Sequence, residues 1–221
     1  MKREIIQTSD GSTTIYLPDM DENYHSTHGA IQEAEHVFIE YGLRSMEAKN
    51  VDTISIFEMG FGTGLNAFLT KVRSKSKIKY TGIEAFPVNQ SEISVLNYVE
   101  LIGEEYAKDF ESIHQADWNK MVQIDELFSL KKVEAKIESF AMPSNHFDLI
   151  YFDAFGPRAQ AEMWHLEILK KMFDGLKVGG ALVTYSARGQ LKRDLKSLGF
   201  TVESLPGPPG KREMTRAWKQ E

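Results

Sequence analysis

The sequence predicts an α/β domain in which a mostly parallel sheet is covered by helices on both faces. From residue 53 to residue 203, apolar runs of strand length alternate with runs of helical periodicity, and this alternation is typical of successive βα units. The strand expected over residues 53–58 also leads into Gly60, Gly62 and Gly64. A strand, a glycine turn and a helix in this order bring bare backbone N–H groups against a nucleotide-like ligand, beyond the carboxyl ends of the strands.

The chain divides into two parts by its pattern. Residues 1–50 are expected to form a short extension that contributes to the pocket, with a strand over 13–17 and a helix over 29–43. Residues 51–221 are expected to form the α/β domain. In that domain, strands are expected over residues 53–58, 78–84, 112–116, 147–152, 181–186, 200–203 and 214–218, and helices over 64–73, 87–101, 163–176 and 191–198.

The end of the chain predicts a reversal of direction. A Pro/Gly cluster at 206–210 lies between the last two expected strands, so one strand of the predicted seven should be antiparallel. Residues 118–142 are ambiguous, because partial alternation of apolar residues there permits further strand.

Length and composition exclude several classes of protein. The chain has 221 residues, which suits one large domain, and no apolar run approaches the ~18 residues of a membrane span. It has no cysteine, which removes disulfides, thiolate metal sites and cysteine nucleophiles. We therefore expect no membrane association, and a reducing cytoplasm as the location.

The charge distribution is uneven. The net charge is −6, whereas proteins that bind duplexes nonspecifically are usually basic. Any contact with nucleic acid must therefore come from a local basic patch. The alternative is that such a cluster of cations is only an ordinary solvated surface. The candidate cations are Arg188, Lys192, Arg193, Lys211, Arg212, Arg216 and Lys219.

The glycine turn indicates which ligand is bound. A dinucleotide fingerprint requires glycine at its sixth position, and that position is Leu65 here. Alternate glycines at 60–64 preceded by an acid, Glu58, resemble motif I of the S-adenosylmethionine methyltransferases. The resemblance implies the class I methyltransferase fold, which is Rossmann-like, with S-adenosylmethionine as the cofactor.

Four acids follow the expected strands. Glu84 lies about 20 residues past the last glycine, where a carboxylate can accept hydrogen bonds from ribose hydroxyls. Asp117 is expected to accept from the adenine amino group, and Glu58 to approach the cationic amino-acid end of the cofactor. Each acid alone is more often a turn or cap residue, but four acids in register with the glycine turn favour a binding site.

The fourth acid, Asp153, is the candidate catalytic residue. It opens the run Asp-Ala-Phe-Gly-Pro after a buried strand. Methyl transfer to an amine requires a neutral nucleophile that leaves carrying positive charge, and a carboxylate near ~3 Å can orient its N–H and stabilise that charge. Since aspartate has a reference pKa near 4, orientation is expected more than outright proton abstraction. The alternative is a capping residue before Pro157.

Several blocks resemble the methyltransferase domain of the bacterial tRNA-modification family MnmC. These blocks are spread over nearly the whole chain. The N-terminal blocks are residues 24–30, Glu33 and residues 36–38, and the next are residues 60–66 and Glu84. The later blocks are residues 153–157, 163–164, 185–186 and 199–200, Gly207 and residues 210–214. The family often has Asn-Pro where this chain has Gln160-Ala161, a departure that is expected to loosen the entry to the helix near the acceptor pocket.

The resemblance implies an activity and a set of contacts. The family uses S-adenosylmethionine to methylate the amine of 5-aminomethyl(-2-thio)uridine at the tRNA wobble position. Asn66, Tyr24 and Ser26 would join the cofactor site or line the uridine pocket. The substrate contacts would be Phe155, Pro157, Tyr185, Lys211 and Arg212. With no second glycine fingerprint in the chain, the resemblance implies a methyltransferase without an FAD-dependent oxidase module.

Two other readings stay open at this point, and a metal site is not one of them. A metal site is not expected, because His25, His28 and His36 have no helical i, i+4 pairing and no Cys or carboxylate cluster completes a set. The chain could instead be a class I methyltransferase that acts on a small-molecule amine. It could also be a cofactor-binding partner in an RNA-modification complex, without catalysis of its own.

Overall fold

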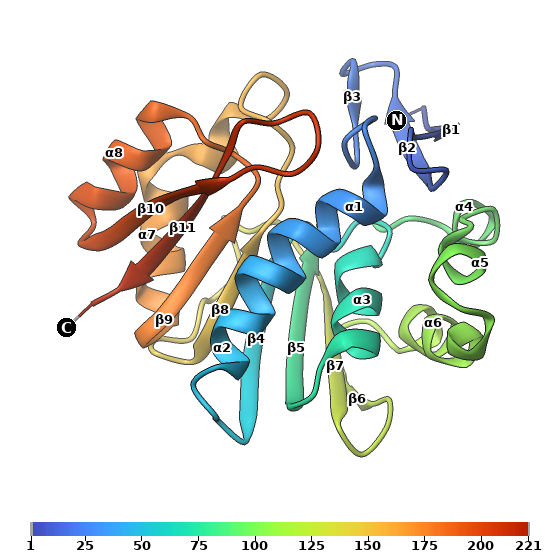
Figure 1. Cartoon of the computed structure of the whole chain (residues 1–221), viewed down its shortest axis with the longest axis horizontal. Coiled ribbons are helices and arrows are strands. Elements are labelled where there is room, and N and C mark those ends of the chain that lie inside the picture. Colours follow the sequence, from blue (N-terminus) through green and yellow to red (C-terminus); the bar gives the residue numbers. More distant parts are fainter. Residues whose placement is uncertain (1, 221) are drawn as a thin grey trace.

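The computed structural model describes residues 2–220 and is built around an eight-stranded sheet (Figure 1). The strand order is β10-β11-β9-β8-β4-β5-β7-β6. The strands are β4 (Thr53–Met59), β5 (Lys77–Glu84), β6 (Met121–Gln123), β7 (Phe128–Glu134), β8 (Phe147–Phe152), β9 (Leu176–Thr184), β10 (Phe200–Pro206) and β11 (Glu213–Lys219). The five central strands from β9 to β7 are parallel, while β11 and β6 pair antiparallel with their neighbours.

Helices cover both faces of this sheet (Figure 1). A continuous helical segment, α1–η1–α2, packs with α3 and α6 on one face, and α7 with α8 packs on the other. The bounds are α1 (Ala30–Ala34), η1 (Glu35–Leu43, a π-helix), α2 (Arg44–Glu47), α3 (Leu65–Arg73), α4 (Gln90–Ile93), α5 (Tyr98–Ile102), η2 (Glu104–Tyr106), α6 (Ala107–Gln115), η3 (Ala161–Trp164), α7 (Leu166–Gly175) and α8 (Gly189–Ser197).

Strand periodicity divides the buried side chains between two cores. In β4, Ile54 and Ile56 face the core under α3, whereas Phe57 and Met59 face the core under α7. Central strands buried on both faces read as nearly continuous apolar runs, and for this reason they were predictable from the sequence.

A small sheet precedes the main one. It contains β1 (Glu4–Gln7), β2 (Thr13–Leu17) and β3 (Glu22–Asn23), paired antiparallel in that order. The expected strand over 13–17 is therefore confirmed, and the expected helix over 29–43 extends further, to Glu47.

One expected strand is wrong. Residues 112–115 belong to the end of α6 and Ala116 is its C-cap, and Phe110 and Ile113 pack inward about one helical turn apart. A short run with apolar residues can satisfy either periodicity, so pattern alone does not separate helix from strand. The neighbour of β5 is instead β7, from the ambiguous region 118–142, and the edge strand β6 adds an eighth strand to the predicted seven.

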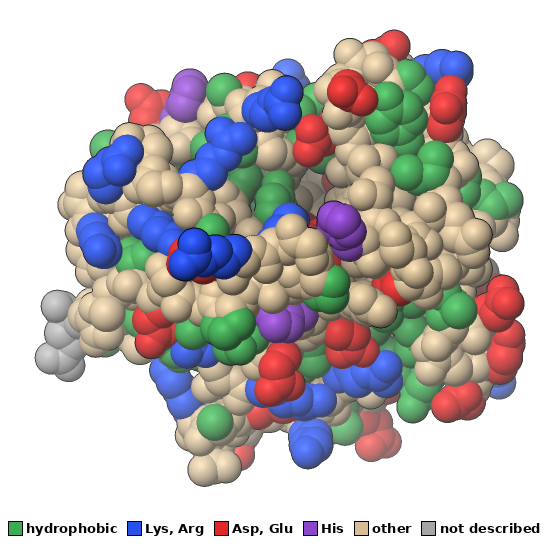
Figure 2. Space-filling model, turned by 45° about the horizontal axis from the view of Figure 1, so that its top comes forward, with side chains coloured by type: hydrophobic (Ala, Val, Ile, Leu, Met, Phe, Trp, Pro, Cys, Tyr) green, Lys and Arg blue, Asp and Glu red, His purple; other side chains and the backbone are tan. Residues whose placement is uncertain are grey.

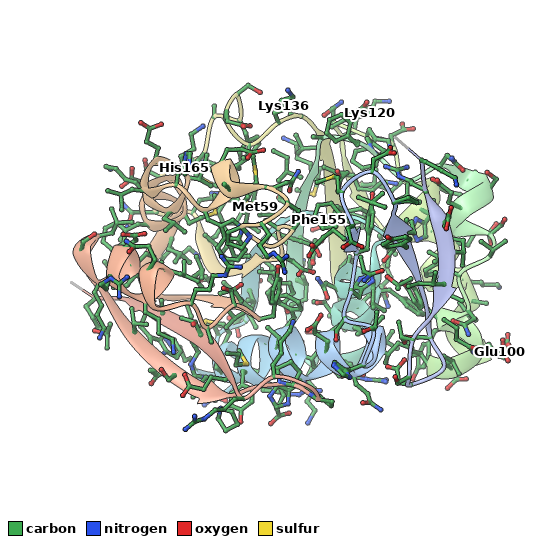
Figure 3. The ribbon with its side chains drawn as sticks, turned by 90° about the horizontal axis from the view of Figure 1, so that it is seen from above. Met59, Glu100, Lys120, Lys136, Phe155 and His165 are labelled. Carbon is green, nitrogen blue, oxygen red and sulfur yellow. The ribbon has the colours of Figure 1, made fainter. Side chains whose placement is uncertain are left out.

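The carboxyl ends of β4, β5, β7 and β8 meet at one edge of the sheet. Figure 3 views the molecule from above this edge and labels Met59, Lys136 and Phe155, which lie at or just after the ends of three of these strands. Within residues 2–220, no helix combines the length and the apolar character needed to cross a membrane.

Candidate functional site

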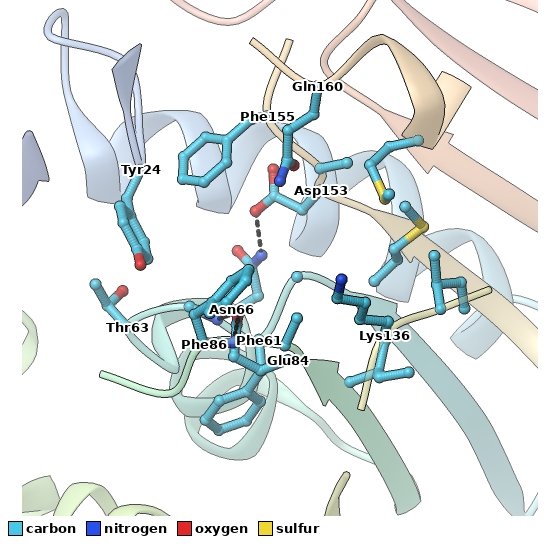
Figure 4. Close-up of a pocket in the computed structure, with 18 of the residues that line it drawn as sticks. Tyr24, Phe61, Thr63, Asn66, Glu84, Phe86, Lys136, Asp153, Phe155 and Gln160 are labelled. Atoms are coloured by element: carbon cyan, nitrogen blue, oxygen red, sulfur yellow. Dashed lines mark hydrogen bonds between the residues drawn. The ribbon is translucent and has the colours of Figure 1, made fainter. Parts of the chain in front are cut away.

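A cavity of about 270 Å³ lies at this edge of the sheet (Figure 4). Its walls come from the segments that follow β4, β5, β7 and β8, together with residues 24–25 of the N-terminal extension. The lining residues are Tyr24, His25, Met59, Gly60, Phe61, Gly62, Thr63, Leu65, Asn66, Ile83, Glu84, Ala85, Phe86, Ala135, Lys136, Ile137, Glu138, Asp153, Ala154, Phe155, Gln160, Glu162 and Met163. We call this the main cavity.

The glycine turn makes room for this cavity. Gly60 has a φ of +92°, and a Cβ added there would lie 2.6 Å from the backbone oxygen of Asp153. Only glycine tolerates both the backbone conformation and the close approach of β4 to β8. Gly62 and Gly64 also have positive φ values, of 49° and 74°.

Four N–H groups of the turn are used within the protein, which corrects the expectation of bare donors at these positions. Gly60 and Phe61 both donate to the carbonyl oxygen of Ile83, at 3.1 and 3.0 Å. The Gly62 N–H donates to Glu84 Oε2 at 2.9 Å, and the Gly64 N–H donates to the Phe61 carbonyl. The turn therefore supplies space and holds a carboxylate.

Glu84 is fixed in place at the end of β5. Its Oε2 accepts from the Gly62 N–H and its Oε1 accepts from the Phe86 N–H, each at 2.9 Å. A carboxylate has about four lone-pair positions, so both oxygens keep capacity for further donors. Since Glu84 lines the main cavity, it can accept hydrogen bonds from neighbouring hydroxyls of a bound ribose.

Asn66 links two acids. Its Nδ2 donates to Glu58 Oε1 at 2.9 Å and to Asp153 Oδ2 at 2.8 Å (Figure 4). Its Oδ1 is buried and has no hydrogen-bond partner within residues 2–220. A buried acceptor without a partner is costly, and Asn66 lines the cavity, so this oxygen suits a ligand that carries a hydrogen-bond donor.

Burial governs the two acids that Asn66 joins. It raises the pKa of Glu58 well above its usual range, and the Asn66 hydrogen bond opposes that rise. Burial also raises the pKa of Asp153 to about 7, assisted by the negative charge of Glu33 and opposed by the Asn66 hydrogen bond and the Lys211 cation. A carboxylate with a pKa near neutrality is a far better proton acceptor than an ordinary aspartate, so Asp153 is suited to orient an amine and to take its proton.

The backbone around Asp153 is held by three contacts. The Asp153 N–H donates to the Met59 carbonyl at 3.0 Å. The Tyr185 hydroxyl donates to the Ala154 carbonyl at 2.8 Å, and the Trp164 Nε1–H donates to the Phe155 carbonyl at 2.7 Å. Tyr185 therefore positions the loop after β8 as well as lining a neighbouring hollow.

That hollow, the adjoining cavity, has a volume of about 380 Å³ and shares Tyr24, His25, Ala154 and Phe155 with the main cavity. The Tyr24 and Phe155 rings meet edge to face at 5.1 Å. The other lining residues are Asp21, Glu22, Asn23, Ser26, Thr27, Glu33, Gly156, Pro157, Arg158, Tyr185, Ser186, Arg188 and Lys211. Asp153 lines only the main cavity, and the next two residues along the chain, Ala154 and Phe155, line both.

The two ends of the chain meet beside the adjoining cavity. Lys211 forms an ion pair with Glu33, 178 residues away in the chain, and its ammonium lies 4.0 Å from the centre of the Tyr185 ring. Glu33 also accepts from the Ser26 N–H at 3.1 Å. A Cβ added to Gly210 would lie 2.1 Å from the ring of His28. The N-terminal block and the C-terminal loop thus form one wall.

Most of the predicted site residues line one of the three neighbouring cavities. Gly60, Gly62, Asn66, Glu84, Asp153, Tyr24 and Phe155 line the main cavity. Ser26, Pro157, Tyr185 and Lys211 line the adjoining one. Arg212 lies in a third, more open hollow of about 500 Å³. Glu58 and Gly64 lie behind the wall of the main cavity and do not line it.

Asp117 does not reach the cavity. Its strand is the end of a helix, and its exposed carboxylate pairs with Lys120 at 2.8 Å. The corresponding wall is formed by Ala135–Glu138, which follow β7. This segment was missed because β7 lay in the ambiguous region, where the alternation of Phe128, Ser129 and Leu130 is interrupted by Lys131 and Lys132.

The histidines of the N-terminal block have ordinary partners. His25 Nδ1 lies 2.8 Å from Thr14 Oγ1, and burial lowers the pKa of His25 to about 4. His36 Nε2 lies 2.8 Å from the Pro206 carbonyl oxygen. Over residues 2–220, no group of three or more His, Cys, Asp or Glu side chains is arranged to hold a metal ion.

Comparisons with known proteins place this site in a family. The model of a family described as "S-adenosyl-L-methionine-dependent methyltransferase" matches residues 95–220. The tRNA 5-methylaminomethyl-2-thiouridine biosynthesis bifunctional protein MnmC of Cupriavidus metallidurans is 27% identical over 97% of this chain and 33% of its own length. The MnmC protein of Leptospira interrogans is 30% identical over 88% of this chain and 32% of its own length. The chain thus spans about a third of these relatives.

Solved structures agree in fold. MnmC2 from Aquifex aeolicus superposes with a TM-score of 0.80 at 27% identity and covers 100% of this chain and 71% of that one. Spermidine synthase from Thermotoga maritima superposes with a TM-score of 0.51 at 14% identity, covering 98% of this chain and 71% of the other, which is a likeness of fold alone. The predicted class I methyltransferase fold is confirmed. Because the family model covers more than half of the chain, the chain belongs to this family of S-adenosyl-L-methionine-dependent methyltransferases and is a methyltransferase domain of the MnmC type.

Proposed function

We propose that this domain methylates the aminomethyl group of 5-aminomethyl(-2-thio)uridine at the tRNA wobble position, with S-adenosylmethionine as the methyl donor. The observation that carries the proposal is the position of Asp153, which lines the main cavity where the adjoining cavity begins. The main cavity suits a methyl donor, and the adjoining cavity suits an amine acceptor that reaches the Asp153 carboxylate. The nucleoside is inferred from the MnmC relatives, which are named for the biosynthesis of 5-methylaminomethyl-2-thiouridine in tRNA.

The main cavity fits the cofactor. The orphaned Oδ1 of Asn66 suits the cationic amino group of its methionine part, and Glu84 suits the ribose hydroxyls. Phe86 and Ile137 offer apolar surface to the adenine ring. This apolar contact replaces the hydrogen bond to adenine that was expected from Asp117. When bound, the cofactor supplies an electrophilic methyl group. The chain itself contributes alignment and exclusion of water.

Asp153 acts on the acceptor amine. Its carboxylate accepts a hydrogen bond from the amine N–H, and this contact directs the nitrogen lone pair toward the main cavity. After the methyl group is transferred, the carboxylate stabilises the ammonium that has formed or takes a proton from it. The raised pKa of about 7 suits both roles. Tyr24, Phe155 and Tyr185, which line the adjoining cavity, offer faces on which a uracil ring can stack once the nucleotide leaves the anticodon stack.

Burial has the largest effect on the pKa of Asp153, and the charges of Glu33 and Lys211 adjust that pKa in opposite directions. The Glu33 charge raises the pKa of Asp153 and the Lys211 charge lowers it. Since the working form is the carboxylate, activity falls as the pH falls through that pKa. We expect Glu33→Gln to move the acidic limb of the kcat/KM profile to lower pH, and Lys211→Met to move it to higher pH.

The pair offers an internal control. The acceptor amine has its own pKa, but that value is the same for every variant, so opposite displacements isolate Asp153. In the double variant Glu33→Gln/Lys211→Met, both charges are removed and the limb should lie between those of the single variants. Displacement of both single variants in the same direction would exclude a charge effect on Asp153. The measurement is kcat/KM against pH, with thermal melting to confirm folding.

The function itself is tested with tRNA that lacks the methyl group. Incubating the protein with labelled S-adenosylmethionine and tRNA from a strain without this modification, followed by nucleoside mass analysis, should show one added methyl on the aminomethyl nitrogen of the wobble uridine. Labelling of a small-molecule amine in place of tRNA would favour the small-molecule methyltransferase. Cofactor binding without any transfer would favour a noncatalytic partner of an RNA-modification complex.

A further inference from the structure

A continuous path leads outward from Asp153. The main cavity shares Ala154 and Phe155 with the adjoining cavity, and the adjoining cavity shares Tyr185, Arg188 and Lys211 with the third hollow. The third hollow, at about 500 Å³, is the most open of the three. A chain-like ligand could therefore place one unit beside Asp153 while its neighbours continue along the surface.

Three arginines follow this path. Arg158 lines the adjoining cavity, Arg188 lines both outer hollows, and Arg212 lines the third. All three residues are exposed. Across the described residues 2–220, none of the three forms an ion pair. Lys and Arg side chains also gather around a hollow on the face shown in Figure 2.

Four of the other cations of the expected basic patch are engaged. Lys192 pairs with Glu213 at 2.8 Å, and Arg216 pairs with Glu203 at 2.7 Å. Lys219 is buried and donates to Asn145 Oδ1 and to two carbonyl oxygens. Lys211 pairs with Glu33. Within residues 2–220, the exposed cations of the patch that form no ion pair are therefore Arg188 and Arg212, which line the path, and Arg193, which does not.

Two acids also line the adjoining cavity. Asp21 lies in the turn before β3 and Glu22 lies in β3, and the Arg158 charge opposes the burial that raises the pKa of Glu22. Neither of these acids lines the third hollow, where Arg188 and Arg212 lie. A polyanion is therefore attracted most strongly where the arginines lead outward, although the chain as a whole has a net charge of −6.

We propose that Arg158, Arg188 and Arg212 form a phosphate-binding track for the nucleotides that flank the target base. This inference rests on the proposed function, since it assumes an RNA substrate, and it names where that RNA lies. Arginine is suited to the role because its planar fork binds phosphate oxygens in a bidentate manner. The RNA backbone runs past the three arginines toward the third hollow, and the target base turns inward past Tyr185 and Phe155.

The track makes a quantitative statement about salt. Each phosphate contact releases condensed counterions, so removing one contact lowers the slope of log K against log salt by about 1. Phosphate contacts carry no sequence information. The loss should therefore be about equal for RNA with and without the aminomethyl group.

The test compares two triple variants with the same change in net charge. One is Arg158→Gln/Arg188→Gln/Arg212→Gln. The control is Lys75→Gln/Lys77→Gln/Lys108→Gln, which removes three exposed lysines away from the path. Fluorescence anisotropy with a labelled anticodon stem-loop RNA measures Kd over a range of salt. Thermal melting and calorimetric S-adenosylmethionine affinity confirm that both variants are folded.

We expect the arginine variant to bind RNA at least about tenfold more weakly at low salt and to lose about 3 units of salt slope, while the control keeps the wild-type slope. Equal losses in both variants, or no loss in the arginine variant, would overturn the track. Methylation by the wild type is scored separately. If RNA binding depends on the arginines but the wild type does not methylate, the track is supported and the proposed function is contradicted. If the wild type methylates but the arginine variant keeps the wild-type salt slope, the proposed function is supported and the track is contradicted.

Discussion

Replacing Asp153 with asparagine is expected to slow methyl transfer by about 10² to 10⁴-fold, which is the range that a positioned acid or base supplies. Asparagine keeps the shape of the side chain and can still accept from Asn66 Nδ2, but it can neither take a proton nor balance an ammonium charge. Affinity for S-adenosylmethionine should stay close to that of the wild type. The measurement is a single-turnover methylation rate, with calorimetry for the cofactor.

The matched control is Asp148→Asn, on β8, the strand that Asp153 directly follows. Asp148 accepts from the Ser55 N–H at 2.8 Å and pairs with Lys177, and it does not line the main or the adjoining cavity. It therefore tests whether loss of a nearby carboxylate slows the reaction through stability. A wild-type single-turnover rate in Asp153→Asn would remove Asp153 from the chemistry. An equal slowing in Asp148→Asn would assign the effect to the fold.

Replacing Gly60 with alanine is expected to abolish cofactor binding and to destabilise the fold. The backbone conformation alone costs about 1–3 kcal/mol for a residue with a side chain. In addition, the new Cβ would lie 2.6 Å from the Asp153 carbonyl oxygen. The strand ends must then separate, which displaces Asp153 and the Glu84 anchor at Gly62. Urea unfolding and calorimetric titration with S-adenosylmethionine measure the two effects.

Gly11→Ala separates the two causes. Gly11 has a similar φ, +86°, but a Cβ added there meets nothing within 4 Å. It should therefore show the backbone cost alone and retain cofactor affinity. If Gly60→Ala and Gly11→Ala lose the same free energy of unfolding, the close approach of β4 to β8 contributes nothing, and the explanation of the glycine turn fails.

The central fold was predictable because buried parallel strands carry continuous apolar runs and the helices between them are amphipathic. The strand over 147–152 and the turn at Gly60 are direct examples. The third strand was misplaced because α6 offers a short apolar run, while β7 carries Lys131 and Lys132 within its span. Lys132 is buried and donates to the His114 carbonyl at 2.7 Å, a tertiary compensation that no local pattern indicates.

The site was predictable where contacts are local in sequence. Gly62 and Glu84 are separated by the length of one βα unit, and the Glu84 carboxylate accepts a hydrogen bond from the Gly62 N–H. The ion pair between Glu33 and Lys211 spans 178 residues, so neither periodicity nor spacing could pair them. The sequence made Lys211 a candidate substrate contact together with Arg212. The engagement of Lys211 by Glu33 moves the proposed RNA contacts to the neighbouring arginines.

The most direct test of the central claim uses two anticodon stem-loop RNAs that differ only in the aminomethyl group of the wobble uridine. Single-turnover incubation of the wild-type protein with labelled S-adenosylmethionine should transfer one methyl to the aminomethyl nitrogen of the first RNA and none to the second. Transfer to neither RNA, or equal transfer to both, would contradict an amine acceptor held at Asp153 between the two cavities.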